Sequence, residues 1–170
     1  METAIMENRT EAIAKFKALV EDVEICMLAT TSDTGELLSR PMATASIDDE
    51  GNVWFFTNEF SEKIHDASHN NEVSLIYAHP GKNIYVHVNG LSTVVIDKNK
   101  IKELWKPFLK AWFPDGIEDP KLCLLKVSPQ EAYYWNSSSN IMVTFFHIIK
   151  AVATQEKYGE GEAGKLKIGK

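Results

Sequence analysis

Residues 52–79 constrain the fold more than any other stretch, because they read as a strand, a short helix and a second strand in succession. Residues 52–57 are rich in aromatic and β-branched side chains and follow an Asp-Asp-Glu-Gly turn, which predicts a strand entered from a hairpin. Ser61 is a suitable N-cap for a helix ending at Asn70, and a further strand is predicted over 73–77. A helix that begins where a strand has just ended presents backbone N–H groups that favour an anion.

Thr57, Ser61 and Lys63 surround this predicted helix start. Capping serines and surface lysines are common at helix starts, so the spacing alone favours an ordinary cap. Arg40 adds weight to a phosphate site because it lies in an otherwise apolar run, LLSRPMATAS, one hairpin earlier. A buried guanidinium needs an anionic partner or a route to water. If the strands are adjacent, we expect Arg40 and Lys63 to converge on one phosphate, that of a cofactor.

The rest of the chain alternates turn residues with short apolar runs, which predicts a mostly antiparallel β-barrel with a few covering helices. Helices are expected at 10–20 and at 98–112, where Pro107 must kink or split the second helix. Gly90 is expected to permit a bend or bulge in a long strand. The strands are expected at residues 23–30, 37–47, 52–57, 73–77, 83–97, 121–128, 132–135 and 141–152.

The 170 residues are expected to form one domain over 1–153, followed by a flexible C-terminal tail. Residues 154–170 hold four of the nine glycines and few apolar side chains, which predicts a segment that is mobile or ordered only by a partner subunit.

Composition limits the partners. A net charge of -6 leaves no broad basic surface, so we expect no nucleic-acid binding, and an anion site must be a local pocket. The N-terminal residues lack a continuous apolar core, and no segment approaches the roughly 20 apolar residues of a membrane helix. We therefore expect a cytoplasmic protein without a membrane partner. Cys26 and Cys123 lie in apolar runs and are expected to be small buried thiols.

Several motifs together resemble one known family. The run FFTNEFSEKIHDASHNNEVSLIYA resembles the aromatic-Thr-Asn-x-x-Ser-x-Lys segment of the pyridoxamine 5'-phosphate oxidase-like, FMN-binding split barrels, with SRPM before it and EAYYW after it. The run LWKPFLKAWFPDGIEDP resembles the general stress protein branch of that superfamily. The resemblance covers residues 14–152. It implies a mainly β fold, a six- to seven-stranded antiparallel split β-barrel of the FMN-binding type.

By this resemblance, Arg40, Ser61 and Lys63 would hold the phosphate of FMN, and Thr57 would contact the phosphate or the ribityl chain. These expectations agree with the physical reading, because a doubly charged phosphate favours cations beside a helix start.

The resemblance also implies how the flavin ring is bound. The backbone of Pro41 and Met42 and that of Phe56 and Thr57 would border the isoalloxazine. Trp135 would cover the flavin from the neighbouring subunit, with a barrel-core aromatic as the alternative. The expected assembly is a homodimer with the cofactor at the interface, and the expected activity is that of an oxidoreductase acting through bound flavin on an unknown redox substrate.

Departures from the oxidase pattern argue against authentic pyridoxamine phosphate oxidation. Glu62 stands where the oxidases usually have an arginine, which removes a cation from the phosphate segment and predicts weaker binding of FMN. Ala45 replaces a lysine that touches the substrate in the oxidases, and Trp135 is followed by NSSSNIM, without the arginine and histidine cluster that grips the vitamin phosphate.

Other aromatic and titratable residues have both a structural and a functional interpretation. Trp105 and Trp112 either pack in the core or form a wall of the ring-side pocket. His65 and His69 are four apart, and a solvated helix face is favoured over a metal pair. His87 either points into the pocket or is an ordinary strand histidine.

Two other functions remain open. One is a non-catalytic stress protein that binds flavin or haem, and the other is a deazaflavin-dependent reductase. A cation near the ring that anchors substrate would favour an enzyme, and the candidates are chiefly Lys82 and Lys106.

Overall fold

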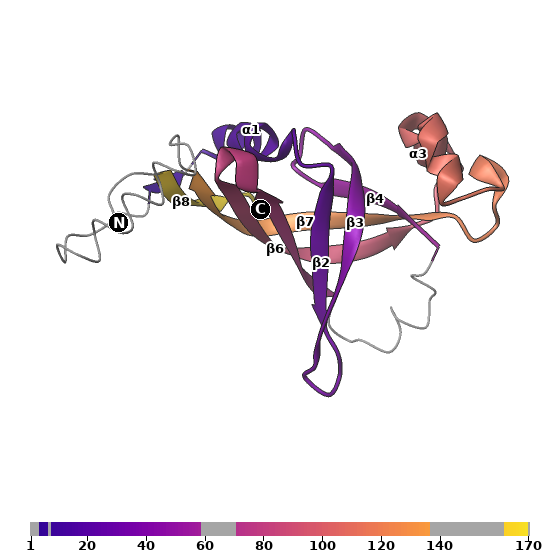
Figure 1. Cartoon of the computed structure of the whole chain (residues 1–170), viewed down its shortest axis with the longest axis horizontal. Coiled ribbons are helices and arrows are strands. Elements are labelled where there is room, and N and C mark those ends of the chain that lie inside the picture. Colours follow the sequence, from indigo (N-terminus) through magenta and orange to yellow (C-terminus); the bar gives the residue numbers. More distant parts are fainter. Residues whose placement is uncertain (1–3, 7, 59–70, 137–161, 170) are drawn as a thin grey trace.

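The computed structural model describes residues 4–6, 8–58, 71–136 and 162–169 (Figure 1). In these residues one helix precedes most of the strands, and a second helix with short 3-10 turns lies between the last long strands. The elements are β1 Ala4–Met6, α1 Arg9–Val20, β2 Ile25–Thr31, β3 Leu37–Ile47, β4 Val53–Thr57, β5 Glu72–His79, η1 Pro80–Lys82, β6 Ile84–Val95, α3 Lys98–Leu104, η2 Pro107–Ala111, η3 Gly116–Glu118, β7 Cys123–Asn136 and β8 Glu162–Lys167.

The strands form one sheet in the order β1-β8-β7-β4-β3-β2-β5-β6, and β6 pairs back onto β7. This last pairing closes β7, β4, β3, β2, β5 and β6 into a six-stranded barrel in which every neighbouring pair is antiparallel. The predicted antiparallel barrel is therefore confirmed. One edge of β7 pairs with β6 along nearly its whole length, and the other edge is divided between β4 and β8.

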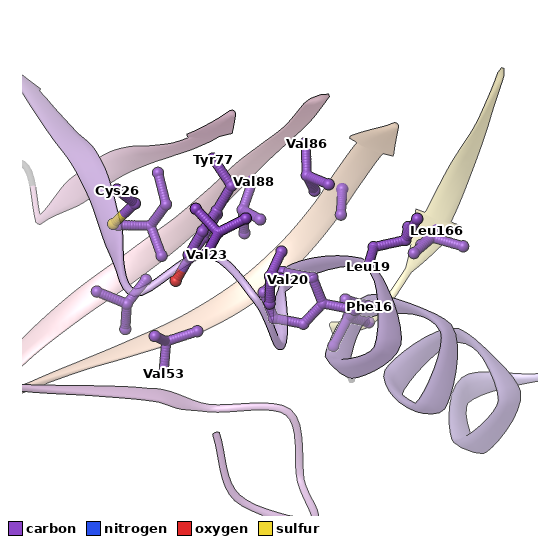
Figure 2. Packing of buried hydrophobic residues seen from close by; sticks show 14 of the residues in the cluster. Phe16, Leu19, Val20, Val23, Cys26, Val53, Tyr77, Val86, Val88 and Leu166 are labelled. Carbon is purple, nitrogen blue, oxygen red and sulfur yellow. The ribbon is translucent and has the colours of Figure 1, made fainter. Parts of the chain in front are cut away.

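The interior of the barrel holds the main hydrophobic cluster, to which α1 contributes one apolar face. Phe16 of α1 is fully buried and meets the ring of Tyr77 edge-on, with 6.1 Å between ring centroids. Cys26, Val53 and Val88 come from three different barrel strands and point into the same cluster (Figure 2). Burial raises the pKa of the Cys26 thiol to about 11, so this residue is the inert buried thiol that was predicted.

Two local predictions are confirmed. The β6–β7 register shifts between Asn89 and Gly90, as expected for a bulge. A Cβ atom at Gly90 would lie 2.9 Å from the carbonyl oxygen of Ser128, so only glycine fits this close approach. The helix predicted over 98–112 is split before Pro107, because α3 ends at Leu104 and η2 begins at the proline.

The prediction of a flexible C-terminal tail is wrong for residues 162–169. Its strand β8 is antiparallel to β7 and parallel to β1, and Leu166 and Ile168 are 0% and 1% exposed. Every second residue of this segment is buried, but the sequence does not show the alternation clearly because glycines and lysines occupy many of its positions. Gly164 is one of these buried positions, where a Cβ atom would lie 2.7 Å from the ring of Tyr134.

Other boundaries differ from the prediction. The strands expected at 121–128 and 132–135 are one continuous strand, β7, and β1 was not predicted. The helix expected after Ser61 and the strand expected at 141–152 lie outside the described residues.

Replacing Leu166 by alanine tests the role of β8 in the core. We expect Leu166→Ala to lower the free energy of unfolding by about 2–5 kcal/mol, because it removes a fully buried side chain from a packed cluster. Urea denaturation followed by circular dichroism measures the change, and Lys167→Ala, at an exposed position of the same strand, is the control. Equal stability of the two variants would show that β8 is not part of the folded core.

Candidate functional site

Arg40 lies on the face of β3 that points into the barrel. It shares this face with Met42, which packs on the barrel core, and with Thr44, whose hydroxyl is hydrogen-bonded to that of Tyr77 at 2.9 Å. The Nη2 atom of Arg40 is buried, although the residue as a whole is only partly so. A guanidinium nitrogen this far from water is suited to binding an anion at the end of the barrel.

Phe56 and Thr57 end the strand next to β3. Thr57 is 5% exposed, and the Sγ atom of Cys123 donates a hydrogen bond of 3.2 Å to its carbonyl oxygen. Phe56 points to the outside of the barrel, where the rings of Trp105 and Phe113 cover it at centroid distances of 5.7 and 6.4 Å. The end of β4 is therefore held on both of its faces.

The predicted residues of β3 and β4 lie on neighbouring strands. The β3–β4 ladder runs from Ile47 paired with Val53 to Thr44 paired with Phe55, where it stops among the described residues. Met42 lies two residues beyond the last paired residue of β3, and Phe56 and Thr57 directly follow the last paired residue of β4.

Ser61 and Lys63 lie outside the described residues, as do Glu62, His65 and His69. The expected convergence of Lys63 and Arg40 on one phosphate is therefore untested, as is the choice between a metal pair and a solvated helix face for His65 and His69. In the described ranges no group of three or more His, Cys, Asp or Glu side chains is arranged to hold a metal ion.

Trp135 lies on the outer face of the barrel. It is 47% exposed and pairs across strands with Tyr85, which is 43% exposed. The alternative of a barrel-core aromatic is therefore wrong. His87 is also on the outer face, where its ring stacks on Tyr133 at 6.1 Å, so it does not point into the barrel.

Exposed apolar side chains continue across this outer face. Met27 of β2 pairs with Ile76 of β5, and the exposed fractions of these side chains are 38% and 47%. We call this surface the barrel face and define it by Ile25, Met27, Ile76, Tyr85 and Trp135.

The two candidate cations for substrate differ in their surroundings. The ammonium group of Lys82 forms an ion pair with Asp22. Lys106 is exposed and lies between Trp105, which packs on Phe56, and Pro107 at the start of η2. The structure therefore favours Lys106 over Lys82 as a group near the end of β4.

A cavity of about 430 Å³ lies elsewhere on the barrel surface and contains none of the predicted residues. Ser74 and Asn89 line it, and the Ser74 hydroxyl donates a 3.0 Å hydrogen bond to Asn89 Oδ1. Glu131 also lines it, and hydrogen bonds from Lys165 and Tyr133 lower the pKa of this carboxyl. Among the described residues its lining includes neither lysine nor arginine. Sequence reasoning missed the cavity because its residues meet only through the strand register.

The described residues fit the phosphate and ring of a flavin in their chemistry. Arg40 supplies a cation with a buried nitrogen, and Met42 in the middle of β3 and Phe56 near the end of β4 supply apolar side chains. No helix in the described ranges is long and apolar enough to cross a membrane.

Comparisons with known proteins agree with this fold. A family model described as "Pyridoxamine 5'-phosphate oxidase like" matches residues 11–159. Protein bli-3 of Neurospora crassa is 30% identical over 137 residues, which cover 75% of this chain and 66% of that protein. The chain thus spans just under two thirds of the length of this relative.

Two solved structures are similar over most of the chain. A general stress protein 26 of Jannaschia sp. CCS1 is 25% identical with a TM-score of 0.68, and the match covers 92% of this chain and 98% of that one. The general stress FMN/FAD binding protein of Xanthomonas citri is 26% identical with a TM-score of 0.64, covering 77% and 92%. Because the family model spans most of the sequence, the chain belongs to the pyridoxamine 5'-phosphate oxidase-like family.

Proposed function

We propose that this protein binds FMN between the middle of β3 and the end of β4, as a homodimer, and acts as an oxidoreductase through the bound flavin. The observation that carries the proposal is Arg40, which lies on the face of β3 that points into the barrel and has a buried guanidinium nitrogen. The similar structure from Xanthomonas citri is that of a general stress FMN/FAD binding protein, which supports a flavin as the ligand.

The phosphate would be held by Arg40 together with Ser61, Lys63 and Thr57. The net charge of the chain is -6, so a local cluster of cations is needed to attract a phosphate. One arginine and one lysine suit a single phosphate group, which favours FMN over a dinucleotide. Glu62 would reduce the local positive charge and with it the affinity.

The ring would lie against the backbone of Pro41 and Met42 and that of Phe56 and Thr57. Two contacts hold the end of β4, the Cys123 hydrogen bond to Thr57 and the packing of Trp105 on Phe56. A border fixed in this way needs little rearrangement on binding, which favours affinity.

The barrel face supports a homodimer. Monomeric proteins rarely expose a contiguous apolar patch of this kind, and the side chains of Met27 and Ile76 lie in register on neighbouring strands. In a twofold dimer the same face meets its copy, so Trp135 would come from the partner to cover the flavin.

Bound flavin would supply the electron-transfer chemistry, and the residues of this chain would bind it, orient it and exclude water. Ala45 leaves the substrate-lysine position of the oxidases without a cation, so authentic pyridoxamine phosphate oxidation is not proposed. A flavin-binding protein without turnover, or one that takes haem or a deazaflavin, is distinguished by the visible spectrum of the purified protein and by assays with an electron donor.

Removing the cations tests the phosphate site. Arg40→Ala and Lys63→Ala should each weaken FMN binding by about 1.5–3 kcal/mol, the range for hydrogen bonds to charged groups. Titration followed by flavin fluorescence measures the affinity, and Lys98→Ala, at an exposed position of α3, controls for net charge. If both variants bind FMN as tightly as the unaltered protein while remaining folded, the phosphate assignment is wrong.

A charge on the barrel face tests the dimer. Ile76→Glu should convert the dimer to a monomer and weaken FMN binding, because it places a carboxylate where two apolar faces meet. Light scattering after size exclusion measures the mass. Ile96→Glu is the control, because Ile96 is 74% exposed but lies outside the barrel face. A monomeric wild-type protein, or a dimer that tolerates Ile76→Glu, would contradict the proposed dimer interface.

A further inference from the structure

The cavity of about 430 Å³ on the barrel surface lies over a row of short side chains on the outer face of the sheet. Ala29, Ser74 and Asn89 are opposite one another on β2, β5 and β6, and all three line the cavity. Met27 and Ile76, which form the next row on one side, are larger and exposed. The cavity is therefore a consequence of the strand register, which brings short side chains together between longer ones.

Apolar side chains border the cavity on the opposite side from Met27 and Ile76. Leu37 at the start of β3 and Leu91 of β6 both line it, and they are 71% and 36% exposed. Small-molecule sites are typically hollows of this size that combine apolar walls with a few polar groups. The apolar part of this cavity would hold the body of a small organic ligand.

The polar part of the cavity offers a hydrogen-bond donor on Asn89. The Ser74 hydroxyl donates a 3.0 Å hydrogen bond to Asn89 Oδ1, which fixes the orientation of this amide. No described residue accepts a hydrogen bond from Asn89 Nδ2. An amide nitrogen donates hydrogen bonds and does not accept them, so Asn89 presents a donor to a ligand.

Glu131 supplies an acceptor next to this donor. It is the cross-strand partner of Asn89 on β7 and lines the same cavity. The ammonium group of Lys165 contacts Glu131 Oε1, and the hydroxyl of Tyr133 donates to Oε2 at 3.0 Å. These hydrogen bonds lower the pKa of the carboxyl, so at neutral pH it has no proton to donate. Each carboxylate oxygen has a further lone pair with which to accept a hydrogen bond from a ligand.

We propose that this cavity binds a small organic molecule through a carboxamide or lactam group. Opposite side chains on paired strands have Cβ atoms about 4.5–5.5 Å apart, a spacing that one amide group can bridge. The carbonyl oxygen of the ligand would accept from Asn89, and its N–H would donate to Glu131. This site goes beyond the proposed function, because its lining contains none of the residues expected to hold FMN.

The donor beside the acceptor distinguishes an amide from charged groups of the same shape. A carboxylate would accept from Asn89 but would be repelled by Glu131. An amidinium would donate to Glu131 but would leave the Asn89 nitrogen facing another donor. Polar groups left unpaired in this way reduce affinity, so both charged groups should bind less well than an amide.

The test compares three ring compounds of nearly equal size, namely benzamide, benzoate and benzamidine. Ligand-observed NMR titrations of the purified protein measure their affinities, with FMN present and with FMN absent. Benzamide should bind about tenfold more tightly than either charged compound, the effect of one mismatched hydrogen bond. N,N-dimethylbenzamide, which has no N–H, should also bind more weakly than benzamide.

Exchanging the donor for an acceptor tests the role of Asn89. Asn89→Asp keeps the shape of the side chain and its hydrogen bond from Ser74. This variant should bind benzamidine more tightly than benzamide, because the ligand then faces two acceptors. Asn99→Asp makes the same change of charge at an exposed position of α3 and should keep the wild-type order of affinities. Glu131→Gln provides an independent variant, and it should improve the binding of benzoate by removing the repulsion.

Three outcomes would overturn the proposal. The first is that benzamide does not bind, as expected if a partner subunit fills the cavity. The second is that Asn89→Asp and Glu131→Gln, both folded by circular dichroism, keep the wild-type order of the three compounds. The third is that FMN displaces benzamide, which would place the compound in the flavin site. Failure to bind FMN leaves the titrations without FMN as the test, so this inference and the flavin proposal stand or fail separately.

Discussion

Pairing along β7 is the constraint on which the rest of the structure depends. Its ladder with β6 closes the barrel, and its other edge holds β4 first and β8 afterwards. The bulge at Gly90 lets β6 follow β7 through this long contact, because a side chain there would collide with the backbone of Ser128. The pairing of Thr57 with Cys123 sets the position of the β4 end. β7 therefore positions residues of the candidate flavin site, although Trp135 is the only residue of β7 among the expected ligand contacts.

The strands with regular alternation could be predicted from the sequence, since apolar side chains at every second residue of β5 and of the first half of β6 reflect one buried face. The β8 strand could not, because its alternation is carried by Gly164 as well as by Leu166, and glycine has no apolar side chain to count. The exposure of Trp135 also required the structure, because a tryptophan in a strand has the same pattern on either face. The cavity beside Asn89 depends on the register of five strands, which local sequence does not specify.

The predicted site separates into a part that the structure describes and a part that it does not. Arg40 and Met42 come from β3, and Phe56 and Thr57 come from the neighbouring strand β4. Ser61 and Lys63 are outside the described residues. The segment from Lys98 to Phe113 was expected mainly as a covering helix. Its two sides differ, because one packs on the outside of β4 and the other presents aromatic rings and lysines to solvent.

The contact between the first helix and the last strand region has a consequence for how the chain folds. Arg9 donates a hydrogen bond to the carbonyl oxygen of Ile168, 159 positions away in the sequence. Closing so large a loop costs chain entropy before any contact is gained, whereas the β2–β3 and β5–β6 hairpins join near neighbours. The hairpins can therefore assemble early, and the seam that joins α1, β1 and β8 is completed late. Until this seam is completed, the edge of β7 that will pair with β8 remains open to pairing with strands of other chains.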